Sequence, residues 1–567
     1  MSALHNQYPD FANPELLEKI PLTARTVLDV GCGQGALGAT YLRRNPACRF
    51  LGIERDAKAA TIAQARLSEV FVGDVEATPM PFEVPGGIDC IIYGDVLGHL
   101  IDPWALLKEH VQYLAPHGTV LVCTPNIEHW SFVARLLSGN FDYEESGLLD
   151  RRHLRWFTPR TMAQALTDAG LALSDAMPRP VAKGKAEAFV TALLPSLQAL
   201  NIDPQDYLQR ASSLQVVWRA HKTGQELIEI ASTMLAPQGG VSDVRVLEPL
   251  RALRTQGGVF SHVAPEQELR PLLGDVPRIA ILHRPLLLGE NGMERVRGLL
   301  QQGYVVVSEF DDHPSFMVER GVELGELLTF KGVHAVQTST PVLAETLVQD
   351  NPEVAVFPNA IFELPPVQNF QDMAHLTVFF GALNRKQDWT PFMPVLNEVA
   401  RAVGERLRFR VLFDEEFYNA LETPYKSFEP ALLDYASYIR ELSAADICFM
   451  PLLDNEFNRA KSDLKFIESA SARVCALASE VVYKSVIQDG QTGMLFHDAA
   501  SLRSALLRLL AYPETTRRIA DASRAYVAQH RMAAYQVDAR VAWYRSLWAR
   551  RDELNEALKA RVPEMFS

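Results

Sequence analysis

Three glycines follow an apolar, β-branched run in the segment VLDVGCGQG at residues 27–35. Gly31, Gly33 and Gly35 carry no Cβ, so the chain can turn sharply there and bring bare backbone amides against a ligand. Glycine-rich turns are common, so this segment alone indicates a ligand-binding turn without naming the ligand.

Acidic residues stand at the ends of the next strand-like runs. Glu54 ends FLGIE, Asp74 follows FVG, and Asp95 follows IIYG. A carboxylate at the tip of the second strand can accept both hydroxyls of a ribose, and Asp74 is placed to reach an adenine amine. Because these acids lie at successive strand ends, we expect them in one crevice at the carboxyl edge of a sheet.

A second group of chemically active residues lies late in the chain. Asn384, Arg385 and Lys386 follow the run LTVFFGA, and Lys465 and Glu468 lie one helical turn apart further on. Residues at this spacing share a helix face, where a lysine can neutralise a diphosphate while a carboxylate holds a ribose. An exposed salt bridge is the alternative explanation of the same spacing.

Strand-like runs alternate with helical patterns along nearly the whole chain, which predicts an α/β protein with parallel sheets covered on both faces. The runs are too many for one sheet, so we divide the chain into three α/β units, at residues 1–222, 225–366 and 373–567. The first unit ends in the strand SLQVVWRAHK, prolines mark the linker before the third unit, and the third ends in a long amphipathic helix. The clearest strand-like segments are RTVLDVG, CRFLGIE, IDCIIYGD, GTVLVCTP, RIAILHR, YVVVSEF, HAVQTST, LTVFFGA, RFRVLF and ICFMPL.

Length, net charge, cysteine content and the lack of long apolar runs narrow the class of protein to which the chain can belong. The chain has 567 residues and a net charge of −14, which argues against nucleic acid as the main partner. Its six cysteines include no Cys-x-x-Cys pair, which indicates free thiols in a reducing compartment. No signal peptide and no run of ~18 apolar residues is recognisable, so we expect a cytoplasmic protein without a transmembrane segment. Homo-oligomerisation stays open.

The glycine turn, GIERD, GD and GDVLGHLIDPW stand in the order found in class I S-adenosylmethionine-dependent methyltransferases, which residues 20–222 resemble. Within that family the chain is most similar to a subgroup found beside glycan-assembly genes, whose members carry a segment like residues 124–158. The resemblance implies a Rossmann-like fold and a cofactor held by Asp29, Gly31, Gly33, Gly35, Glu54, Asp74 and Asp95. A nicotinamide cofactor is the alternative, but the spacing is Gly-x-Gly-x-Gly and not Gly-x-Gly-x-x-Gly.

Methyl transfer to a hydroxyl needs the oxygen aligned with the methyl group, and usually a base that takes the proton. His99, His129 and His153 are the candidates, and we select His153 and His99 as catalytic; a structural role in the loop is the alternative. The family commonly has a glutamate where this chain has Gly98. That departure motivates a second hypothesis, in which the domain binds its cofactor without catalysis.

Residues 225–548 resemble glycosyltransferases of the two-lobed GT-B fold, near the large retaining group 1 (GT4-like) family that uses nucleotide sugars. The matching segments are HAVQTSTPVLAETL, VAVFPNAI, FFGALNRKQDW, SDLKFIESASARVCALAS and QDGQTGMLFHD. The resemblance implies that Arg385, Lys386 and Lys465 neutralise the leaving nucleoside diphosphate and that Glu468 binds its ribose. It also implies that Gly240, in PQGGVSDVR, faces the cleft.

Two further expectations follow from that resemblance. His283, Arg284, Asp311, Asp312 and His313 lie at strand ends where an acceptor sugar would approach. The family's paired glutamates lie eight positions apart, but this chain has Ala460 at the first position, with Asp463 as the available substitute. We expect no metal, because GT-B enzymes generally need none.

The sequence therefore predicts a bifunctional glycan-modifying enzyme. It would transfer a sugar from a nucleotide sugar, and a methyl group from S-adenosylmethionine, to a polysaccharide or glycoprotein acceptor. The alternatives are a glycosyltransferase with a non-catalytic cofactor-binding domain, and a non-enzymatic scaffold in a glycan assembly complex. The donor sugar, the linkage, the stereochemical course and the methylated position stay open.

Overall fold

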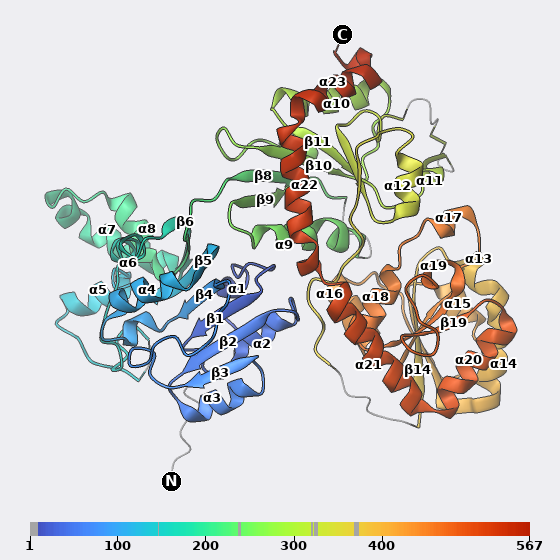
Figure 1. The fold of residues 1–567 in the computed structure, drawn as a ribbon, viewed down its shortest axis with the longest axis horizontal. Helices are drawn as coiled ribbons and strands as arrows, with labels where there is room; N and C mark the ends of the chain where they lie inside the picture. Colours follow the sequence, from blue (N-terminus) through green and yellow to red (C-terminus); the bar gives the residue numbers. More distant parts are fainter. Residues whose placement is uncertain are drawn as a thin grey trace. The chain divides into compact units, whose positions relative to one another are not determined.

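The computed structural model describes residues 10–145, 147–235, 240–318, 321–322, 327–367 and 374–566 (Figure 1). The chain forms two compact units: unit 1 comprises Met1–Glu226 and Arg254–Gly258, and unit 2 comprises Leu227–Leu253 and Val259–Ser567. Both are built from strands alternating with helices, which confirms the predicted α/β class. Every strand-like segment quoted above forms a strand.

Unit 1 begins with the strands and helices that surround the glycine turn. Its elements are α1 (Pro14–Leu17), β1 (Thr26–Val30), α2 (Ala36–Leu42), β2 (Arg49–Glu54), α3 (Ala57–Gln64), β3 (Glu69–Val72), β4 (Ile88–Gly94), the 3₁₀ turn η1 (Leu97–His99), α4 (Pro103–Gln112), β5 (Leu114–Pro125), α5 (Trp130–Leu137), α6 (Pro159–Asp168), β6 (Ala172–Pro180), α7 (Lys183–Ala199), α8 (Pro204–Ser212) and β7 (Ser213–His221).

The seven strands of unit 1 form one sheet in the order β3-β2-β1-β4-β5-β7-β6. The central strands are parallel and buried on both faces. Leu28 and Val30 of β1 enter one apolar core, while Val27 enters the core on the opposite face. This two-sided burial explains why the segment reads as a continuous apolar run.

The sequence analysis expected parallel sheets, but β7 runs antiparallel to both β5 and β6. The chain leaves β6 at the carboxyl edge of the sheet, forms α7 and α8, and enters β7 at that same edge, so β7 must run back. Helices α5, α7 and α8 pack on one another around Val190, Leu197 and Ala211. They form a small helical layer at the end of the sheet where the predicted site lies.

Unit 2 contains two further sheets. The elements of its first half are β8 (Ile228–Ser232), the π-helical turn η2 (Asp243–Leu247), α9 (Glu248–Arg254), β9 (Val259–Val263), η3 (Glu266–Glu268), β10 (Arg278–His283), α10 (Gly289–Gln301), β11 (Val305–Glu309), α11 (Ser315–Val318), β12 (Ala335–Thr338), α12 (Pro341–Leu347) and β13 (Val354–Val356). We call this part the β8–β13 half.

The β14–β19 half follows. Its elements are β14 (Leu376–Gly381), α13 (Lys386–Trp389), η5 (Thr390–Phe392), α14 (Met393–Val403), η6 (Gly404–Arg406), β15 (Leu407–Leu412), α15 (Glu415–Ala420), β16 (Lys426–Glu429), α16 (Tyr435–Ser443), β17 (Ile447–Met450), α17 (Glu456–Arg459), α18 (Leu464–Ser471), β18 (Cys475–Ser479), α19 (Glu480–Tyr483), β19 (Met494–Phe496), α20 (Ala499–Ala511) and α21 (Pro513–His530). The chain closes with η7 (Ala533–Tyr535), α22 (Val537–Ala549), α23 (Arg551–Arg561) and η8 (Pro563–Phe566).

Both sheets of unit 2 are parallel and six-stranded. Their orders are β13-β12-β11-β10-β8-β9 and β16-β15-β14-β17-β18-β19. Parallel strands bring all their carboxyl ends to one edge, so the residues that follow β8, β10, β11 and β13 meet at one edge, and those that follow β14 and β17 meet at another. These two edges supply the cavity described below.

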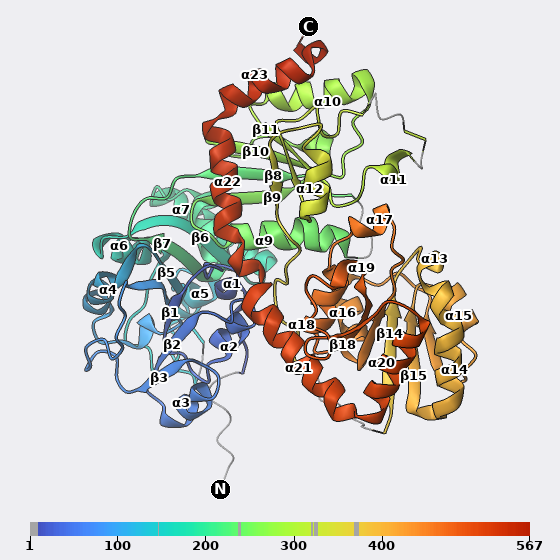
Figure 2. The same cartoon turned by 45° about the vertical axis from the view of Figure 1, so that its right-hand side comes forward.

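The final helices return to the first sheet of unit 2 (Figure 2). Helix α21 packs against α18 and β18, whereas α22 packs against β10. Leu558, Val562 and Met565 join the apolar core of the β8–β13 half. The sequence analysis assigned residues 373–567 to one unit with one terminal helix; the structure instead ends α22 at Ala549 and packs the last segment on the other half.

No helix among the described residues is both long enough and apolar enough to cross a bilayer. All six cysteines are buried, and none forms a disulfide.

Candidate functional site

The glycine turn of unit 1 adopts the backbone that the sequence predicts. Gly31, Gly33 and Gly35 have φ values of +74°, +55° and +77°, in the left-handed region that favours glycine. A Cβ on Gly31 would lie 3.0 Å from a methyl carbon of Val96, so the tip of β4 closes against the turn. The turn is therefore shaped by its glycines and lies at the switch point between β1 and β4.

Glu54 lies beside this turn at the end of β2. The Gly33 N–H donates to its Oε2 at 2.8 Å, and the Asp56 N–H donates to its Oε1 at 2.8 Å. The side chain is buried, at 3% exposure. The structure thus brings the predicted ribose-binding acid and the glycine turn into one place.

Asp29 is a second buried carboxylate at this position. Burial, together with the nearby charge of Glu54, raises its pKa to about 8. Two neighbouring carboxyl groups favour a ligand that carries positive charge. Such a ligand would stabilise the ionised form of Asp29.

The other two predicted acids differ from each other. Asp95, at φ +58°, ends β4 and accepts a 2.9 Å hydrogen bond from Gln215 Nε2, and burial raises its pKa. Asp74 lies in an exposed turn after β3, where its Oδ1 accepts the Glu76 N–H. Asp95 therefore lies at the carboxyl edge of the sheet, whereas Asp74 lies in an exposed turn after β3.

The two histidines selected as catalytic lie together. The rings of His99 and His153 stack, with centroids 4.6 Å apart and planes 19° from parallel. His153 is 8% exposed, and its Nδ1 is buried without a hydrogen-bond partner. Burial and the neighbouring His99 lower the pKa of His153, so its imidazole is neutral at neutral pH and able to take a proton.

Gly98 is explained by this arrangement. A Cβ at position 98 would lie 2.8 Å from Cδ2 of His153 and 3.3 Å from the carbonyl oxygen of Arg155. The Gly98 carbonyl also accepts the N–H groups of Leu154 and Arg155, at 2.8 and 3.0 Å. Where relatives by resemblance have a glutamate, this chain has bare backbone on which the His153 segment docks.

The third histidine candidate lies elsewhere. His129 caps the start of α5, is 3% exposed and forms a 2.8 Å hydrogen bond through Nδ1 with Ser131 Oγ. It takes no part in the stacked pair, so its surroundings favour a structural role.

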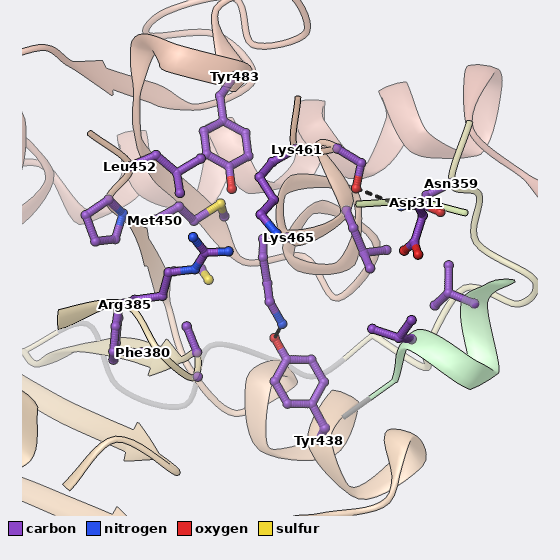
Figure 3. Close-up of a pocket in the computed structure, with 18 of the residues that line it drawn as sticks. Asp311, Asn359, Phe380, Arg385, Tyr438, Met450, Leu452, Lys461, Lys465 and Tyr483 are labelled. Atoms are coloured by element: carbon purple, nitrogen blue, oxygen red, sulfur yellow. Dashed lines mark hydrogen bonds between the residues drawn. The ribbon is translucent and has the colours of Figure 1, made fainter. Parts of the chain in front are cut away.

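Unit 2 contains a cavity of about 200 Å³ between its two halves (Figure 3). Residues that follow strand ends in both sheets line it, which is where parallel α/β sheets bind ligands. The lining from the β8–β13 half is Val241, Val244, Arg245, Arg284, Asp311, Asp312 and Asn359. The β14–β19 half contributes Phe379, Phe380, Gly381, Ala382, Arg385, Tyr438, Cys448, Phe449, Met450, Pro451, Leu452, Lys461, Ser462, Leu464, Lys465 and Tyr483.

Three cations of the β14–β19 half line this cavity: Arg385, Lys461 and Lys465. Arg385 and Lys465 were predicted from the sequence to bind the diphosphate, and Lys461 was not. Lys461 lies in a polar turn between α17 and α18, where no helical or strand periodicity indicates which side chains are buried. Only the fold shows that it points into the cavity. Burial lowers its pKa, and Arg385 contributes in the same direction.

Lys386 lies outside the cavity lining, contrary to what the sequence predicts. Its ammonium group pairs with Glu416 at 2.7 Å, and both side chains are more than 60% exposed. It begins α13, whose first turn directs the side chain toward α15 instead.

Glu468 lies behind the cavity wall at 2% exposure. Its Oε2 accepts hydrogen bonds from Lys465 Nζ at 3.3 Å and from Tyr438 OH at 3.4 Å, and Lys465 Nζ also donates to Tyr438 OH at 2.8 Å. The predicted ribose contact of Glu468 would therefore require Tyr438 or Lys465 to move. In this structure Glu468 positions Lys465.

Gly240 does not line the cavity, although its neighbour Val241 does. Its φ is +86°, and a Cβ there would lie 2.8 Å from the ring of Tyr435. Residues Pro237–Gly239 of the predicted glycine loop lie outside the described residues.

The structure also shows what surrounds position 460, where the glycosyltransferase family has its first glutamate. Ala460 is 2% exposed and packs in the core of the β8–β13 half. Asp463, the substitute considered from the sequence, forms an ion pair with Arg531, and both side chains are 12% exposed.

The strand-end residues of the β8–β13 half form ion pairs. Arg284 Nε donates to Asp311 Oδ1 at 2.6 Å, and Lys461 Nζ donates to Asp312 Oδ1 at 2.6 Å. His283 is 2% exposed, and neither ring nitrogen has a hydrogen-bond partner. His313 bonds to Ser315 Oγ at 2.8 Å and does not line the cavity.

Comparison with known proteins identifies unit 1. A family described as "Methyltransferase domain" matches residues 5–175. The ubiquinone biosynthesis O-methyltransferase of Pseudomonas paraeruginosa is 28% identical over 166 residues, which cover 28% of this chain and 69% of that protein. Unit 1 therefore contains a methyltransferase domain, as predicted. This match favours a methyltransferase over the nicotinamide interpretation.

Two solved structures illustrate the structural likeness. A SAM-dependent methyltransferase from Archaeoglobus fulgidus is 14% identical, with a TM-score of 0.27, 37% of this chain covered and 95% of that one. TarM of S. aureus, solved with UDP, is 10% identical, with a TM-score of 0.36, 47% of this chain covered and 55% of that one. Both TM-scores lie below 0.5, so neither likeness decides a function.

We expect Gly98→Ala to destabilise unit 1 by about 1–3 kcal/mol, because the new methyl group overlaps His153. The same change in a His153→Ala background should cost clearly less, because the obstructing ring is gone. Chemical denaturation of the four proteins of this cycle measures the coupling. Equal costs in both backgrounds would show that His153 does not rest on Gly98.

Asp29 makes the stability of unit 1 depend on pH. Its folded pKa of about 8 exceeds an unfolded value of about 3.9, so the folded state holds the proton more tightly and loses stability as pH rises between them. Asp29→Asn should flatten this fall, which reaches about 1.4 kcal/mol per pH unit. Melting temperatures from pH 5 to 9 measure it, with Glu69→Gln, an exposed acid paired with Arg49, as the control. Identical pH profiles for wild type and Asp29→Asn would contradict the assignment.

Proposed function

We propose that this chain is a bifunctional transferase that modifies glycans. Unit 1 transfers a methyl group from S-adenosylmethionine to a sugar hydroxyl, and unit 2 is a GT-B glycosyltransferase that uses a nucleotide sugar. The proposal rests on two separate groups of polar residues at the carboxyl ends of parallel strands: carboxyl groups beside the glycine turn in unit 1, and cations around the cavity in unit 2.

The site of unit 1 fits S-adenosylmethionine. Gly31, Gly33 and Gly35 give the turn its left-handed backbone, and Asp29 and Glu54 offer carboxylates for the ligand's positive charge and its ribose hydroxyls. The raised pKa of Asp29 supports this fit, because a cationic ligand relieves the repulsion between the two acids. When bound, the cofactor supplies an activated methyl group on its sulfonium.

The stacked His99–His153 pair supplies the base. Val96 contacts the glycine turn and lies two residues from Gly98, on which His153 rests, so the pair lies close to the cofactor site. A neutral His153 can accept the proton of an attacking hydroxyl, and His99 stacked on it holds the ring in place. His153 would take the proton of the hydroxyl group, whose oxygen would replace the cofactor's sulfur as the bonding partner of the methyl carbon.

The cavity of unit 2 supports an anionic ligand. Its lining contains Arg245, Arg284, Arg385, Lys461 and Lys465, against the carboxylates Asp311 and Asp312. Five cations and two acids line the cavity, and three of the cations also pair with acids behind the lining: Arg245 with Glu309, Arg385 with Asp388 and Lys465 with Glu468. Guanidinium and ammonium groups are the donors that bind diphosphates, so a nucleoside diphosphate would compete with these acids for them. Arg385, Lys461 and Lys465 would stabilise the charge that develops on the departing diphosphate.

Two parallel sheets that meet over such a cavity agree with the GT-B fold expected from the sequence. A growing glycan is an acceptor common to both reactions, and covalent linkage of the two enzymes raises the effective concentration of one product near the next site. Either order of sugar transfer and methylation is compatible with this arrangement.

Binding of S-adenosylmethionine tests the first activity. Calorimetry with the full chain should give a Kd at least tenfold weaker for Glu54→Ala than for wild type, whereas Glu69→Ala should bind as wild type does. Transfer of a labelled methyl group to a glycan fraction then separates catalysis from binding alone. Label that remains only on the cofactor would favour the non-catalytic alternative, and absence of heat with wild type would refute the site.

Nucleotide binding tests the second activity. In a thermal-shift panel of UDP, GDP, ADP and dTDP, at least one should raise the melting temperature of unit 2. Lys465→Ala and Lys461→Ala should weaken that nucleotide about tenfold or more, because each removes a charged contact. Lys386→Ala, which changes a lysine outside the cavity, should have no effect. Equal losses for all three lysine variants would show that the cavity is not the binding site.

A further inference from the structure

The cavity of unit 2 has two chemically different ends. Figure 3 shows Lys461 and Lys465 in its middle, with Arg385 on one side and Asp311 and Asn359 on the other. The Arg385 side is walled by apolar and aromatic residues such as Phe380 and Met450. The opposite side is walled by polar groups of the β8–β13 half. A ligand that spans the cavity thus meets cations first and a polar compartment beyond them.

The polar compartment consists of side chains that other residues hold in place. Arg284 Nε contacts Asp311 at 2.6 Å, and Arg284 Nη2 lies 3.5 Å from Asp312. Lys461, from the β14–β19 half, contacts Asp312 at 2.6 Å. The carboxylates of Asp311 and Asp312 are both only 11% exposed. Such ion pairs fix two acids in orientation without using all their lone pairs.

Two buried polar side chains complete the wall. Asn359, at 3% exposure, donates to Ser462 Oγ at 2.8 Å and accepts from Arg245 Nη1 at 2.9 Å. Arg245 in turn pairs with Glu309 at 2.8 Å. The compartment therefore presents oriented hydrogen-bond acceptors, and its acids are matched by cations, so it is close to neutral.

We propose that Asp311 and Asp312 bind the hydroxyl groups of the sugar carried by the nucleotide donor, and that this sugar is neutral. The inference rests on the proposed glycosyltransferase function of the same cavity. With the diphosphate held by Lys461 and Lys465, the group attached to it lies toward these two acids. Hydroxyl groups donate to carboxylates, whereas a uronic acid would place a third carboxylate against Asp311 and Asp312.

The structure also explains how the same residues affect the diphosphate. Asp312 neutralises Lys461 while the cavity is empty of anions, so replacing it frees a cation for the phosphate groups. Asp312→Asn should therefore weaken sugar recognition and leave diphosphate binding unchanged or stronger. A residue with a purely structural role would change both affinities in the same direction.

The test compares a nucleoside diphosphate with its sugar conjugates on the full chain. Calorimetry measures Kd for UDP, UDP-glucose and UDP-N-acetylglucosamine, or for GDP and GDP-mannose, or dTDP and dTDP-rhamnose, according to the nucleotide that stabilises wild type. We expect the ratio of the diphosphate Kd to the sugar-conjugate Kd to fall at least tenfold in Asp311→Asn and in Asp312→Asn. Asp454→Asn, an exposed acid paired with Arg459, serves as the matched control and should keep the wild-type ratio.

Two results would overturn the inference: an unchanged ratio in both variants, or diphosphate and sugar-conjugate affinities that fall in parallel. Melting curves check folding, and Asp312→Asn decides if Asp311→Asn unfolds, because it leaves the Arg284–Asp311 pair intact. If no nucleotide binds to wild type, the glycosyltransferase assignment itself fails, and that outcome is distinct from a changed ratio.

Discussion

A carboxylate at the buried end of a parallel strand costs free energy unless a cation or several hydrogen-bond donors meet it. Parallel sheets make this situation unavoidable, because all their strands end at one edge and polar residues gather there. In unit 2 each such acid has a cation from elsewhere in the chain. Glu309 has Arg245, Asp311 has Arg284, and Asp312 has Lys461. The first two pairs lie within the β8–β13 half, and the third joins the two halves at the cavity.

In unit 1 the acids at the carboxyl edge of the sheet have different surroundings. Asp29 is buried near a second acid, Glu54, and burial together with the charge of Glu54 raises its pKa to about 8. Glu54 accepts hydrogen bonds from backbone amides of Gly33 and Asp56. In unit 1 two neighbouring carboxyl groups suit a cationic nucleoside, whereas the five cations that line the cavity of unit 2 suit a diphosphate. The two proposed donors differ in the same way: S-adenosylmethionine carries a positive sulfonium, and a nucleotide sugar carries a negative diphosphate.

Much of the architecture follows from local pattern. The alternation of β-branched runs and amphipathic helices predicted several strands of each of the three sheets, because strands buried on both faces must be apolar throughout. The glycine turn and the acid at the end of β2 were predicted for the same reason: positive φ and a strand-end position are local properties. The antiparallel β7 was not predicted, because strand direction depends on where α7 and α8 lead the chain.

The side chains that face a cavity were predicted less well. Lys386 follows the end of β14 and Lys461 lies between α17 and α18, yet Lys461 points into the cavity and Lys386 pairs with Glu416 outside it. By itself the sequence determined the α/β class, the methyltransferase domain and the glycine turn, because these depend on residue type and short spacing. Only the tertiary structure decided that His153 rests on Gly98, that Glu468 lies behind Lys465 and Tyr438, and that Asp312 meets Lys461. Each of these contacts joins different strand or helix ends, and the direction of a side chain there is set by packing between elements and not by local pattern.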